Sequence, residues 1–484
     1  MRAAFAVRRP EDMPPSAWLV EMSPGETLLT AGRRVEVGDD WFFEGVFAGP
    51  FTRTGLENTP YRFGSGAVLD DSRITFLAPS HPFEPVYCFV AREEPRAIVS
   101  NSFACAVGAA GIEFGVEEYA RVIEVARNMK TGITGYSRVL HDGPDGVLFR
   151  YAYFRFDLPR FGSSPREIPE PAGPAPFHDY RSYVAHVTGS LRSIVDNARD
   201  RRRSHRHHHL VSSCSAGYDS PACATLARSV GLERVITLEA GRGGAADNGE
   251  GIARILGLEC RVGPRLGADL ETPIHRDHYV DPALLPAGLL ADLMPFFSCP
   301  ETVEDAFLAV FGDELAGAVF FTGFMGGGIW GLKDKVGPQM NRMDNSGASL
   351  EEFRKRLGFA HVPIPTIAAR HVRTIRAITH SDEMRPYRVG GWYDRPIPRR
   401  ILEEAGVPRE MFGRDKGRGS VLFEISGLAP LAPEDATEEE KRLHRSTLEV
   451  RHRAVNTLAR EYREILGLSV RPREASREPA APGM

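Results

Sequence analysis

The N-terminal third of the chain consists of short apolar runs separated by glycine, proline and aspartate turns. Runs of this length between turn residues are typical of β-strands. We therefore predict that the first 155 or so residues are β-rich, with one helix at Val116–Asn128, where apolar residues recur at helical spacing. The predicted strands include Trp18–Glu21, Ile74–Leu77, Val86–Val90 and Val147–Phe154.

From residue 209 onward the pattern changes to strands that alternate with helices. Ser220–Val230 and Ala246–Leu256 have helical spacing, and each is closed by a glycine, Gly231 or Gly257. This alternation predicts a parallel, doubly wound sheet with right-handed crossovers. The strands predicted for the sheet are His209–Ser213, Val235–Glu239 and Glu259–Val262.

Four further stretches differ in composition. Five prolines between Pro165 and Pro176 are too many for a helix or a strand, so we predict a linker over Phe161–Phe177. Arg201–His209, RRRSHRHHH, suits a solvated loop, and a metal site is the alternative, without an acidic partner or fixed spacing to support it. Helical periodicity dominates Glu301–Leu466 apart from the glycine-rich Gly323–Gly331, and the tail Arg471–Met484 is predicted to be disordered.

Length and charge limit the function. A chain of 484 residues is long enough for two or three domains with cores of their own. Hydrophobic residues make up 42% and charged residues 26%, both close to the averages of globular proteins. The 60 basic and 64 acidic side chains leave a net charge of −4, so the chain as a whole does not have the charge of a polyanion-binding protein.

Cysteine usage and hydropathy indicate a cytoplasmic protein. The six cysteines include no C-x-x-C pair, as expected of reduced thiols, and we interpret none as a zinc ligand. The most apolar stretches, such as Leu284–Phe297, are short and are interrupted by residues such as Pro286 and Pro295. The N-terminus has no apolar segment of signal-peptide length, so we expect no membrane association.

The segment Ser213–Ser220, SCSAGYDS, joins the first strand of the predicted parallel sheet to its first helix. A helix N-terminus offers unpaired N–H groups, Gly217 allows close approach of an anion, and the hydroxyls of Ser215 and Ser220 add donors. Asp219 would repel a bare phosphate, so we expect a divalent cation to accompany the anion. The lysine of G-x-x-x-x-G-K-[ST] loops is absent, which disfavours γ-phosphate cleavage. An ordinary polar turn is the alternative.

The hexapeptide Ser215–Ser220 resembles the S-x-G-x-D-S loop of the PP-loop ATP pyrophosphatases, in particular of the asparagine synthetase and β-lactam synthetase branch. Other segments resemble this family in the same order along most of the chain. In the C-terminal part they are Val235–Leu238, Asp247–Glu250, Phe320–Gly323, Tyr393–Pro398 and Gly413–Gly417. In the N-terminal part they are Phe76–Tyr87, Ile98–Ser102 and Gly135–Leu140.

The resemblance implies an α/β protein. Residues 1–160 would form a β-rich sandwich similar to the N-terminal nucleophile fold of glutamine amidotransferases, degenerate here, followed by a Pro-rich linker at 161–177. Residues 178–470 would form a doubly wound parallel-sheet synthetase domain with a helical C-terminal part, and residues 471–484 a disordered tail. ATP and Mg²⁺ are the implied cofactors, with Asp219 as the metal ligand. The residues implied to bind the nucleotide are Ser213, Ser215, Ala216, Gly217, Asp219, Ser220, Leu238, Gly323 and Gly326.

Two departures from the family bear on activity. Its glutaminases have a cysteine after the initiator methionine, but Arg2 follows Met1 here, so we expect no glutamine hydrolysis. The family's second pyrophosphate-binding motif has an Asp or Tyr and, three residues later, an Asp, where this chain has Phe324 and Gly327. Either the backbone amides of Gly326–Gly328 form an anion-binding nest instead, or the site is inactive.

The resemblance also implies the catalytic residues. Lys416 corresponds to the family's catalytic lysine, whose ammonium can stabilise charge at the α-phosphate and at a tetrahedral carbon. Glu383, together with Tyr387, is a candidate base for the incoming amine, and a helix N-cap at Ser381 followed by first-turn carboxylates is the alternative. Three arginines either bind an anionic substrate or form a solvated charged face: Arg395, Arg399 and Arg400.

We therefore expect an ATP-dependent, AMP-forming ligase that makes an amide or lactam. A small-molecule carboxylate would attack the α-phosphate and release pyrophosphate, and an amine from a source other than a glutaminase site of this chain would displace AMP. A membrane partner is not expected, nucleic acid is disfavoured, and a homodimer stays open. The rival is a catalytically silent nucleotide-binding or interaction protein that retains the fold. Adenylation followed by transfer to sulfur or tRNA is a third alternative, and the near-neutral charge argues against tRNA.

Overall fold

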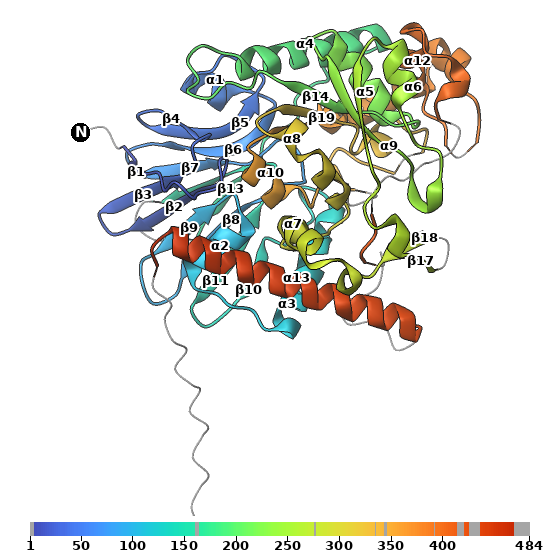
Figure 1. The fold of residues 1–484 in the computed structure, drawn as a ribbon. Coiled ribbons are helices and arrows are strands. Elements are labelled where there is room, and N and C mark those ends of the chain that lie inside the picture. The colour runs from blue at the N-terminus through green and yellow to red at the C-terminus, as the bar shows by residue number, and fades with distance from the viewer. Residues whose placement is uncertain are drawn as a thin grey trace, which may run out of the picture.

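Figure 1 shows the computed structural model of the chain. The structure describes residues 4–159, 164–274, 277–333, 335–342, 346–391, 393–413, 421–424 and 436–468. The predicted catalytic residue Lys416 and the predicted disordered tail, residues 471–484, lie outside these ranges.

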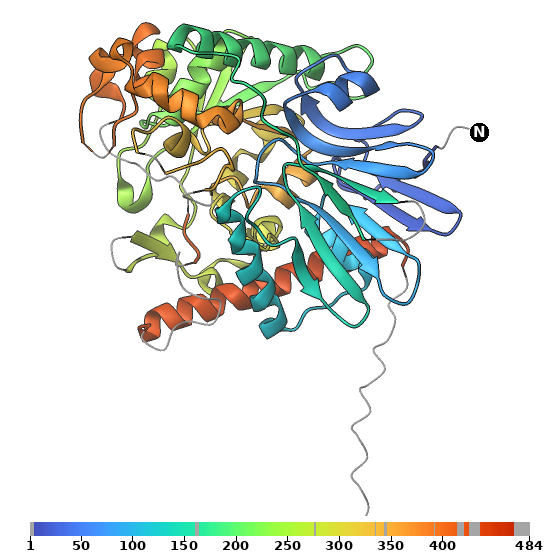
Figure 2. The same cartoon turned by 180° about the vertical axis from the view of Figure 1, so that it is seen from behind.

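The N-terminal half of the fold, which comprises the elements up to Ile168, contains two sheets, which Figure 2 shows from behind. One has seven strands in the order β1-β3-β2-β9-β8-β11-β10, antiparallel except for the β1–β3 pair. The other has six antiparallel strands in the order β13-β12-β7-β6-β5-β4. The strands are β1 (Ala6–Arg8), β2 (Trp18–Ser23), β3 (Glu26–Ala31), β4 (Glu36–Val37), β5 (Trp41–Phe47), β6 (Arg62–Leu69), β7 (Arg73–Leu77), β8 (Val86–Ala91), β9 (Ala97–Ser100), β10 (Val139–Asp142), β11 (Gly146–Tyr151), β12 (Arg155–Pro159) and β13 (Arg166–Ile168).

These two sheets pack face to face through aromatic and aliphatic side chains. The ring of Trp18 from β2 lies 5.0 Å from that of Phe42 on β5 and 6.1 Å from that of Phe76 on β7, measured between centroids. Val20 and Val99 belong to the same buried cluster. Each strand contributes alternate residues to this layer because successive side chains point to opposite faces. The prediction of a β-rich N-terminal half is confirmed.

The prediction of one helix in this half is incomplete. α3 (Val116–Arg127) is present as predicted, but α1 (Arg53–Asn58) and α2 (Phe103–Ala110) were not predicted. α2 buries every residue from Phe103 to Ala109. A helix that is buried on all sides has no polar face, so its sequence lacks the periodicity by which an amphipathic helix is found.

A five-stranded, entirely parallel sheet forms the centre of the C-terminal half, in the order β16-β15-β14-β19-β20. The predicted parallel sheet is thereby confirmed. Its strands are β14 (Leu210–Ser213), β15 (Arg234–Leu238), β16 (Glu259–Gly263), β19 (Val319–Thr322) and β20 (Ala360–Pro363). The last two lie in the stretch that we expected to be helical. Each has four buried residues, and so short an apolar run does not distinguish a strand from a helix.

Two helices connect the first three strands of this sheet. α5 (Asp219–Arg228) follows β14 and begins one residue before the predicted start. α6 (Glu250–Ile255) is shorter than predicted, because the preceding residues are not helical and Asn248 forms a β-bridge with Ser215. The polar residues ahead of α6 therefore belong to the loop region around Ser215.

Two of the segments predicted to be loops are more ordered than expected. Within the predicted linker, Arg166–Ile168 pairs with β12 as strand β13. In the arginine- and histidine-rich run, Arg203 donates hydrogen bonds to Asn197, and His207 contacts the carbonyl oxygen of Gly317 through Nδ1 at 2.9 Å. Both side chains are buried, so this run is only partly solvated.

The two halves share packed cores. One buried cluster joins Val46 and Phe63 of the six-stranded sheet to residues of the parallel-sheet half such as Val319. The long C-terminal helix α13 packs on α2 through residues such as Leu458, and it crosses the lower side of the molecule in Figure 1. The other elements are α4 (Tyr180–Ala198), β17 (Glu271–Ile274), β18 (Asp277–Val280), α7 (Ala287–Phe297), α8 (Gly312–Leu315), α9 (Gly326–Ile329), α10 (Glu351–Leu357), α11 (Val372–His380), α12 (Pro396–Glu404) and α13 (Glu438–Ile465), with 3₁₀ turns that include η1 (Asn128–Thr131) and η8 (Asp382–Tyr387).

The structure also describes the environment of the cysteines and the length of the apolar helices. All six cysteines are free, and five of them are buried. Across the described ranges, no helix has both the length and the apolar composition needed to cross a bilayer.

Candidate functional site

A cavity of about 510 Å³ opens at the carboxyl ends of the parallel strands β14, β15 and β19. The chain leaves β14 toward β15 on one side, whereas β19 lies on the other side, so the cavity is at the switch point of the sheet, where α/β proteins commonly bind ligands. The residues that line it are Lys130, Ser213, Cys214, Ser215, Gly217, Tyr218, Asp219, Ser220, Ile236, Thr237, Leu238, Arg242, Asp247, Asp277, Tyr279, Glu304, Phe307, Leu308, Phe311, Phe320, Gly323, Phe324, Met325, Gly326, Gly327, Ser346, Tyr393, Arg395 and Leu422.

The loop after β14 is held by its own hydroxyl groups. The backbone N–H of Ser215 donates to Oγ of Ser220 at 3.0 Å, and that hydroxyl lies 3.0 Å from Oγ of Ser215. The N–H of Gly217 donates to Oγ of Ser215 at 3.2 Å. This network curls the chain around the start of α5, whose first-turn N–H groups have no intrahelical acceptors. The arrangement suits an anion at the helix N-terminus.

The glycine-rich loop after β19 packs directly against the loop after β14. A Cβ atom at Gly323 would lie 2.7 Å from backbone atoms of Asp219 and Ser220, and one at Gly326 would lie 2.5 Å from Cγ of Asp219. Met325 has a φ of +65°, a left-handed conformation that costs energy for a residue with a side chain. Glycine is therefore required where the two loops meet, and both loops face the same cavity.

Arg395 supplies positive charge to this end of the cavity. Its guanidinium forms an ion pair with the carboxylate of Asp219, and it lies over the ring of Tyr393, 4.9 Å from the centroid. A Cβ atom at Gly327 would lie 2.7 Å from Nη2 of Arg395. The guanidinium thus lies beside the position at which the resemblance led us to expect an acidic residue.

This arrangement fits a nucleotide better than a Mg²⁺ ion held between the loops. Two glycine-containing loops, serine hydroxyls and a guanidinium provide donors for phosphate oxygens. Asp219 is the only acidic residue in the two loops, and its carboxylate is already paired with Arg395. A hard cation needs oxygen ligands, and a guanidinium in the same place repels it. The binding of Mg²⁺ by Asp219 stays a prediction, and no chemical step is assigned to the metal.

The wall next to these loops is formed by β15 and the segment before α6. Ile236, Thr237 and Leu238 end β15, and Oγ1 of Thr237 accepts a hydrogen bond from the N–H of Gly249 at 3.0 Å. Asp247 is buried beside the loop after β14, and its backbone carbonyl accepts from the N–H of Ala216 at 3.2 Å. Burial raises the pKa of the Asp247 carboxyl group to about 6.

Other parts of the cavity lining carry charged and apolar groups that sequence reasoning missed. Lys130, from η1 in the N-terminal half, lines it together with Glu304, and burial lowers the pKa of the Lys130 ammonium. Arg242 and Asp277 form an ion pair at 3.3 Å. The apolar lining here includes Phe307, Leu308, Phe311 and Leu422. These residues lie in five separate segments, and no local motif connects them.

The structure brings most of the predicted nucleotide-binding residues together. All of them line the cavity except Ala216, which holds the loop through its backbone and accepts a hydrogen bond from the N–H of Gly413 at 2.9 Å. Glu383 does not line the cavity. Its carboxylate accepts from the N–H of Tyr180 and from Arg400, each at 3.0 Å. Glu383 is a first-turn carboxylate of η8, as the alternative expects, but the side chain of Ser381 makes no capping hydrogen bond there.

The three arginines that sequence left undecided are separated by the fold. Only Arg395 lines the cavity. Arg399 is buried and donates to the hydroxyl of Tyr218, whereas Arg400 lies over the ring of Tyr180, 3.9 Å from the centroid, and pairs with Glu404. An anion-binding role in the cavity is therefore open to Arg395 alone of the three.

Comparison with known proteins gives little. No protein family matches the chain, and no curated protein is similar to it. A solved structure described as a predicted subunit of tRNA methyltransferase, from Methanocaldococcus jannaschii, is similar to it at 17% sequence identity over 44% of this chain and 96% of that one, with a TM-score of 0.19. The function is therefore proposed from the cavity itself.

Proposed function

We propose that the chain is an ATP-dependent, AMP-forming ligase related to the asparagine synthetases and β-lactam synthetases. The observation that carries the proposal is the meeting of two loops, Ser213–Ser220 and Gly323–Gly327, at the carboxyl ends of adjacent parallel strands around one cavity. Neither loop carries the lysine of a γ-phosphate-cleaving P-loop. Phosphate groups bound there would be held by N–H groups and hydroxyls.

In this proposal each part of the cavity has one task. Ser215, Ser220 and the amides around Gly217 donate to the pyrophosphate, and Arg395 offsets its charge. The β15 wall at Leu238 takes the adenine ring. The part of the lining with Lys130 and Glu304 takes the carboxylate and amine substrates, because it carries groups of both signs.

The chemistry is two displacements. A carboxylate oxygen attacks the α-phosphorus of ATP and pyrophosphate leaves, which forms an acyl-adenylate. The amine nitrogen then attacks the acyl carbon and AMP leaves. Negative charge develops on the phosphate oxygens and then on the oxygen of the tetrahedral intermediate, where a lysine is effective. Lys416 is proposed for that role by resemblance, and Glu383 is not used because the structure places it outside the cavity.

ATP–pyrophosphate exchange tests this proposal. Purified protein is incubated with ATP, labelled pyrophosphate and fractions of small-molecule carboxylates, with and without Mg²⁺. Label entering ATP only when a carboxylate is present shows reversible adenylation. ATP binding by calorimetry without exchange in any fraction favours the silent nucleotide-binding rival, and absence of both contradicts the proposed site.

The N-terminal half is proposed to resemble a glutamine amidotransferase domain without its activity. The cysteines of this half, Cys88 and Cys105, are buried, which raises the pKa of both thiols. A thiol that is buried and protonated is a poor nucleophile. We expect no glutamate release from glutamine by the pure protein, as measured by a coupled glutamate assay. Release that persists through purification contradicts this expectation.

A further inference from the structure

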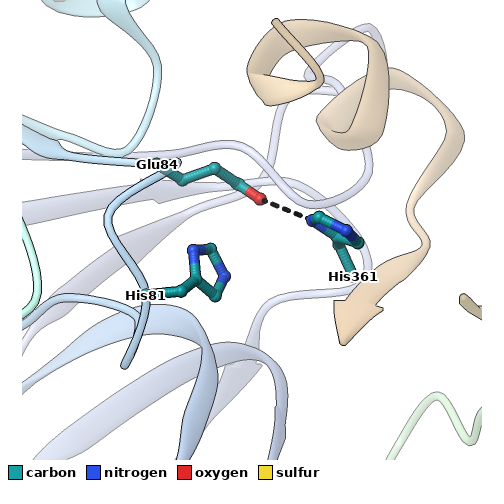
Figure 3. A group of neighbouring side chains, drawn as sticks. All are labelled: His81, Glu84 and His361. Carbon is teal, nitrogen blue, oxygen red and sulfur yellow. Dashed lines mark ion pairs between the residues drawn. The ribbon is translucent and has the colours of Figure 1, made fainter. Parts of the chain in front are cut away.

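A second group of chemically capable side chains lies outside the lining of the cavity, between the two halves of the molecule. His81 and Glu84 come from the segment between β7 and β8, and His361 is the second residue of β20. Figure 3 shows the three side chains converging from opposite sides. One ligand atom from each lies within 4.8 Å of the other two, and all three residues are buried. Within the described part of the chain, no other such group was found.

The hydrogen bonds around the group leave ligand atoms available. Nε2 of His361 lies 2.8 Å from the hydroxyl of Thr322, whereas its Nδ1 is buried without a hydrogen-bond partner and is 4.0 Å from Oε1 of Glu84. Oε2 of Glu84 accepts from Nε of Arg354 at 2.7 Å. A buried polar atom without a partner is destabilising, so a ligand at Nδ1 would remove a cost.

We propose that His81, Glu84 and His361 bind one Zn²⁺ ion. Two imidazoles and one carboxylate are a donor set that Zn²⁺ takes in proteins. Tetrahedral ligands at the usual bond lengths lie roughly 3.4 Å apart, so the side chains would move inward on binding. The hydrogen bond between Nε2 of His361 and the hydroxyl of Thr322 fixes the orientation of the imidazole ring, as the hydrogen-bond partners of metal-binding histidines do.

The buried charges around the group are mixed. Arg354, Lys355 and, farther off, Arg342 oppose a cation there. Glu44 pairs with Arg354 through both carboxylate oxygens at 2.8 Å, Glu84 pairs with the same guanidinium, and Glu351 interacts with Lys355. Glu44 accounts for the charge of Arg354, Glu84 lies between that guanidinium and the proposed ion, and Arg342 pairs with Glu301.

A Zn²⁺ ion here would join the two halves behind the nucleotide cavity. Its ligands come from the N-terminal half and from the parallel sheet, and Thr322 directly precedes Gly323 of the glycine-rich loop. The ion would hold this loop in register with the segment before β8. The inference does not depend on the proposed ligase activity, because a structural metal is detected without ATP or substrate.

Zinc content tests the proposal. Exposed histidines of the run Arg201–His209 could bind zinc adventitiously, so the background protein carries His205→Gln, His208→Gln and His209→Gln. It is produced in zinc-supplemented cells, because a buried site fills as the chain folds, and is then dialysed against a chelator. We expect about one zinc per chain, and a lower melting temperature for protein produced without zinc.

Two variants of the proposed ligands and one matched control show whether the zinc is bound at this group. His81→Gln and His361→Gln should each lose most of the zinc, with affinity falling by about 100-fold or more. His207→Gln changes another buried histidine, outside the group, and should retain it. Glu84→Gln replaces either variant if that variant fails to fold. The proposal is overturned if the background protein contains no zinc. It is also overturned if every ligand variant retains zinc, or if the protein contains a different metal in place of zinc.

Discussion

At the scale of single residues, Arg395 decides the charge in the part of the cavity that we propose to bind phosphate. Arg395→Gln keeps a polar side chain but removes the guanidinium and leaves the carboxylate of Asp219 facing bound phosphate. We expect ATP affinity to fall by about 10- to 100-fold, because this loss corresponds to the free energy of one charge-assisted hydrogen bond. Calorimetry with ATP measures the change.

Arg400→Gln is the control for this variant. Arg400 lies within helix α12, whose N-cap residue is Arg395, but it does not line the cavity, so ATP affinity should stay within about twofold. Asp219→Asn combined with Arg395→Gln should recover part of the loss, because the repelling carboxylate is gone. Equal affinity of Arg395→Gln and the unmodified chain would show that the guanidinium does not meet phosphate.

Asp247 makes stability depend on pH. Its pKa is raised to about 6 by burial, so the folded chain binds this proton more tightly than the unfolded chain. The contribution of the Asp247 carboxyl group to the free energy of unfolding is largest below about pH 4, and it falls as the pH rises from about 4 to about 6. Asp247→Asn should therefore be more stable than the unmodified chain at pH 7, on the order of 2–3 kcal/mol, and the difference should close near pH 4.

Urea denaturation without ligand at both pH values measures this effect. Asp269→Asn changes an exposed aspartate and should alter stability by less than about 0.5 kcal/mol at either pH. A difference between Asp247→Asn and the unmodified chain that stays constant across the pH range would exclude the titration of this group as its cause.

At the scale of elements, the contact between α2 and α13 requires a glycine. A Cβ atom at Gly108 would lie 2.3 Å from the carbonyl oxygen of Ala459 on α13. Gly108→Ala should therefore destabilise the fold by about 1–3 kcal/mol through overpacking, although alanine is the better helix former. The free energy of unfolding in urea measures it.

Gly189→Ala is the matched control. Gly189 is exposed within helix α4, and no atom lies within 4 Å of a Cβ built there. Helix propensity then acts alone, so this substitution should stabilise the fold by up to about 1 kcal/mol. Opposite signs for the two glycines are the expected result. A stabilising Gly108→Ala would mean that the two helices are farther apart than this contact requires.

At the scale of the whole molecule, a buried ionic network joins the halves. Arg354 on α10 pairs with Glu44 of β5 and with Glu84 ahead of β8. Arg354→Met leaves both carboxylates buried without the guanidinium, which should cost about 3–5 kcal/mol. Because the network spans both halves, we expect a single unfolding transition to shift, as measured by circular dichroism and tryptophan fluorescence together.

The exposed ion pair of Arg92 with Asp142 provides the comparison. Arg92→Met should cost no more than about 1 kcal/mol, because solvent screens such a pair. If Arg354→Met instead produced two transitions, with that of the N-terminal half unchanged, the halves would be independent folding units and not one cooperative structure.

The elements with local signals were predictable from the sequence. Strands β14, β15 and β16 and helix α5 follow from alternating apolar runs and glycine stops, because both depend on residues a few positions apart. The loop Ser213–Ser220 was predictable for the same reason, and the resemblance added Gly323 and Gly326. Each carries its chemistry within one short segment, and the structure brings both segments to the cavity.

Long-range pairing was decided only by the tertiary structure. α10, with five charged residues among its seven, has the composition of an exposed helix, yet Glu351, Glu352, Arg354 and Lys355 are buried. Each of these four has a partner more than 200 residues away along the chain, as in the Arg354–Glu44 pair. Lys130 reaches the cavity from the other half, and His361 meets His81 in the same way. Such contacts depend on how helices and strands pack against one another, and no local sequence pattern encodes that packing.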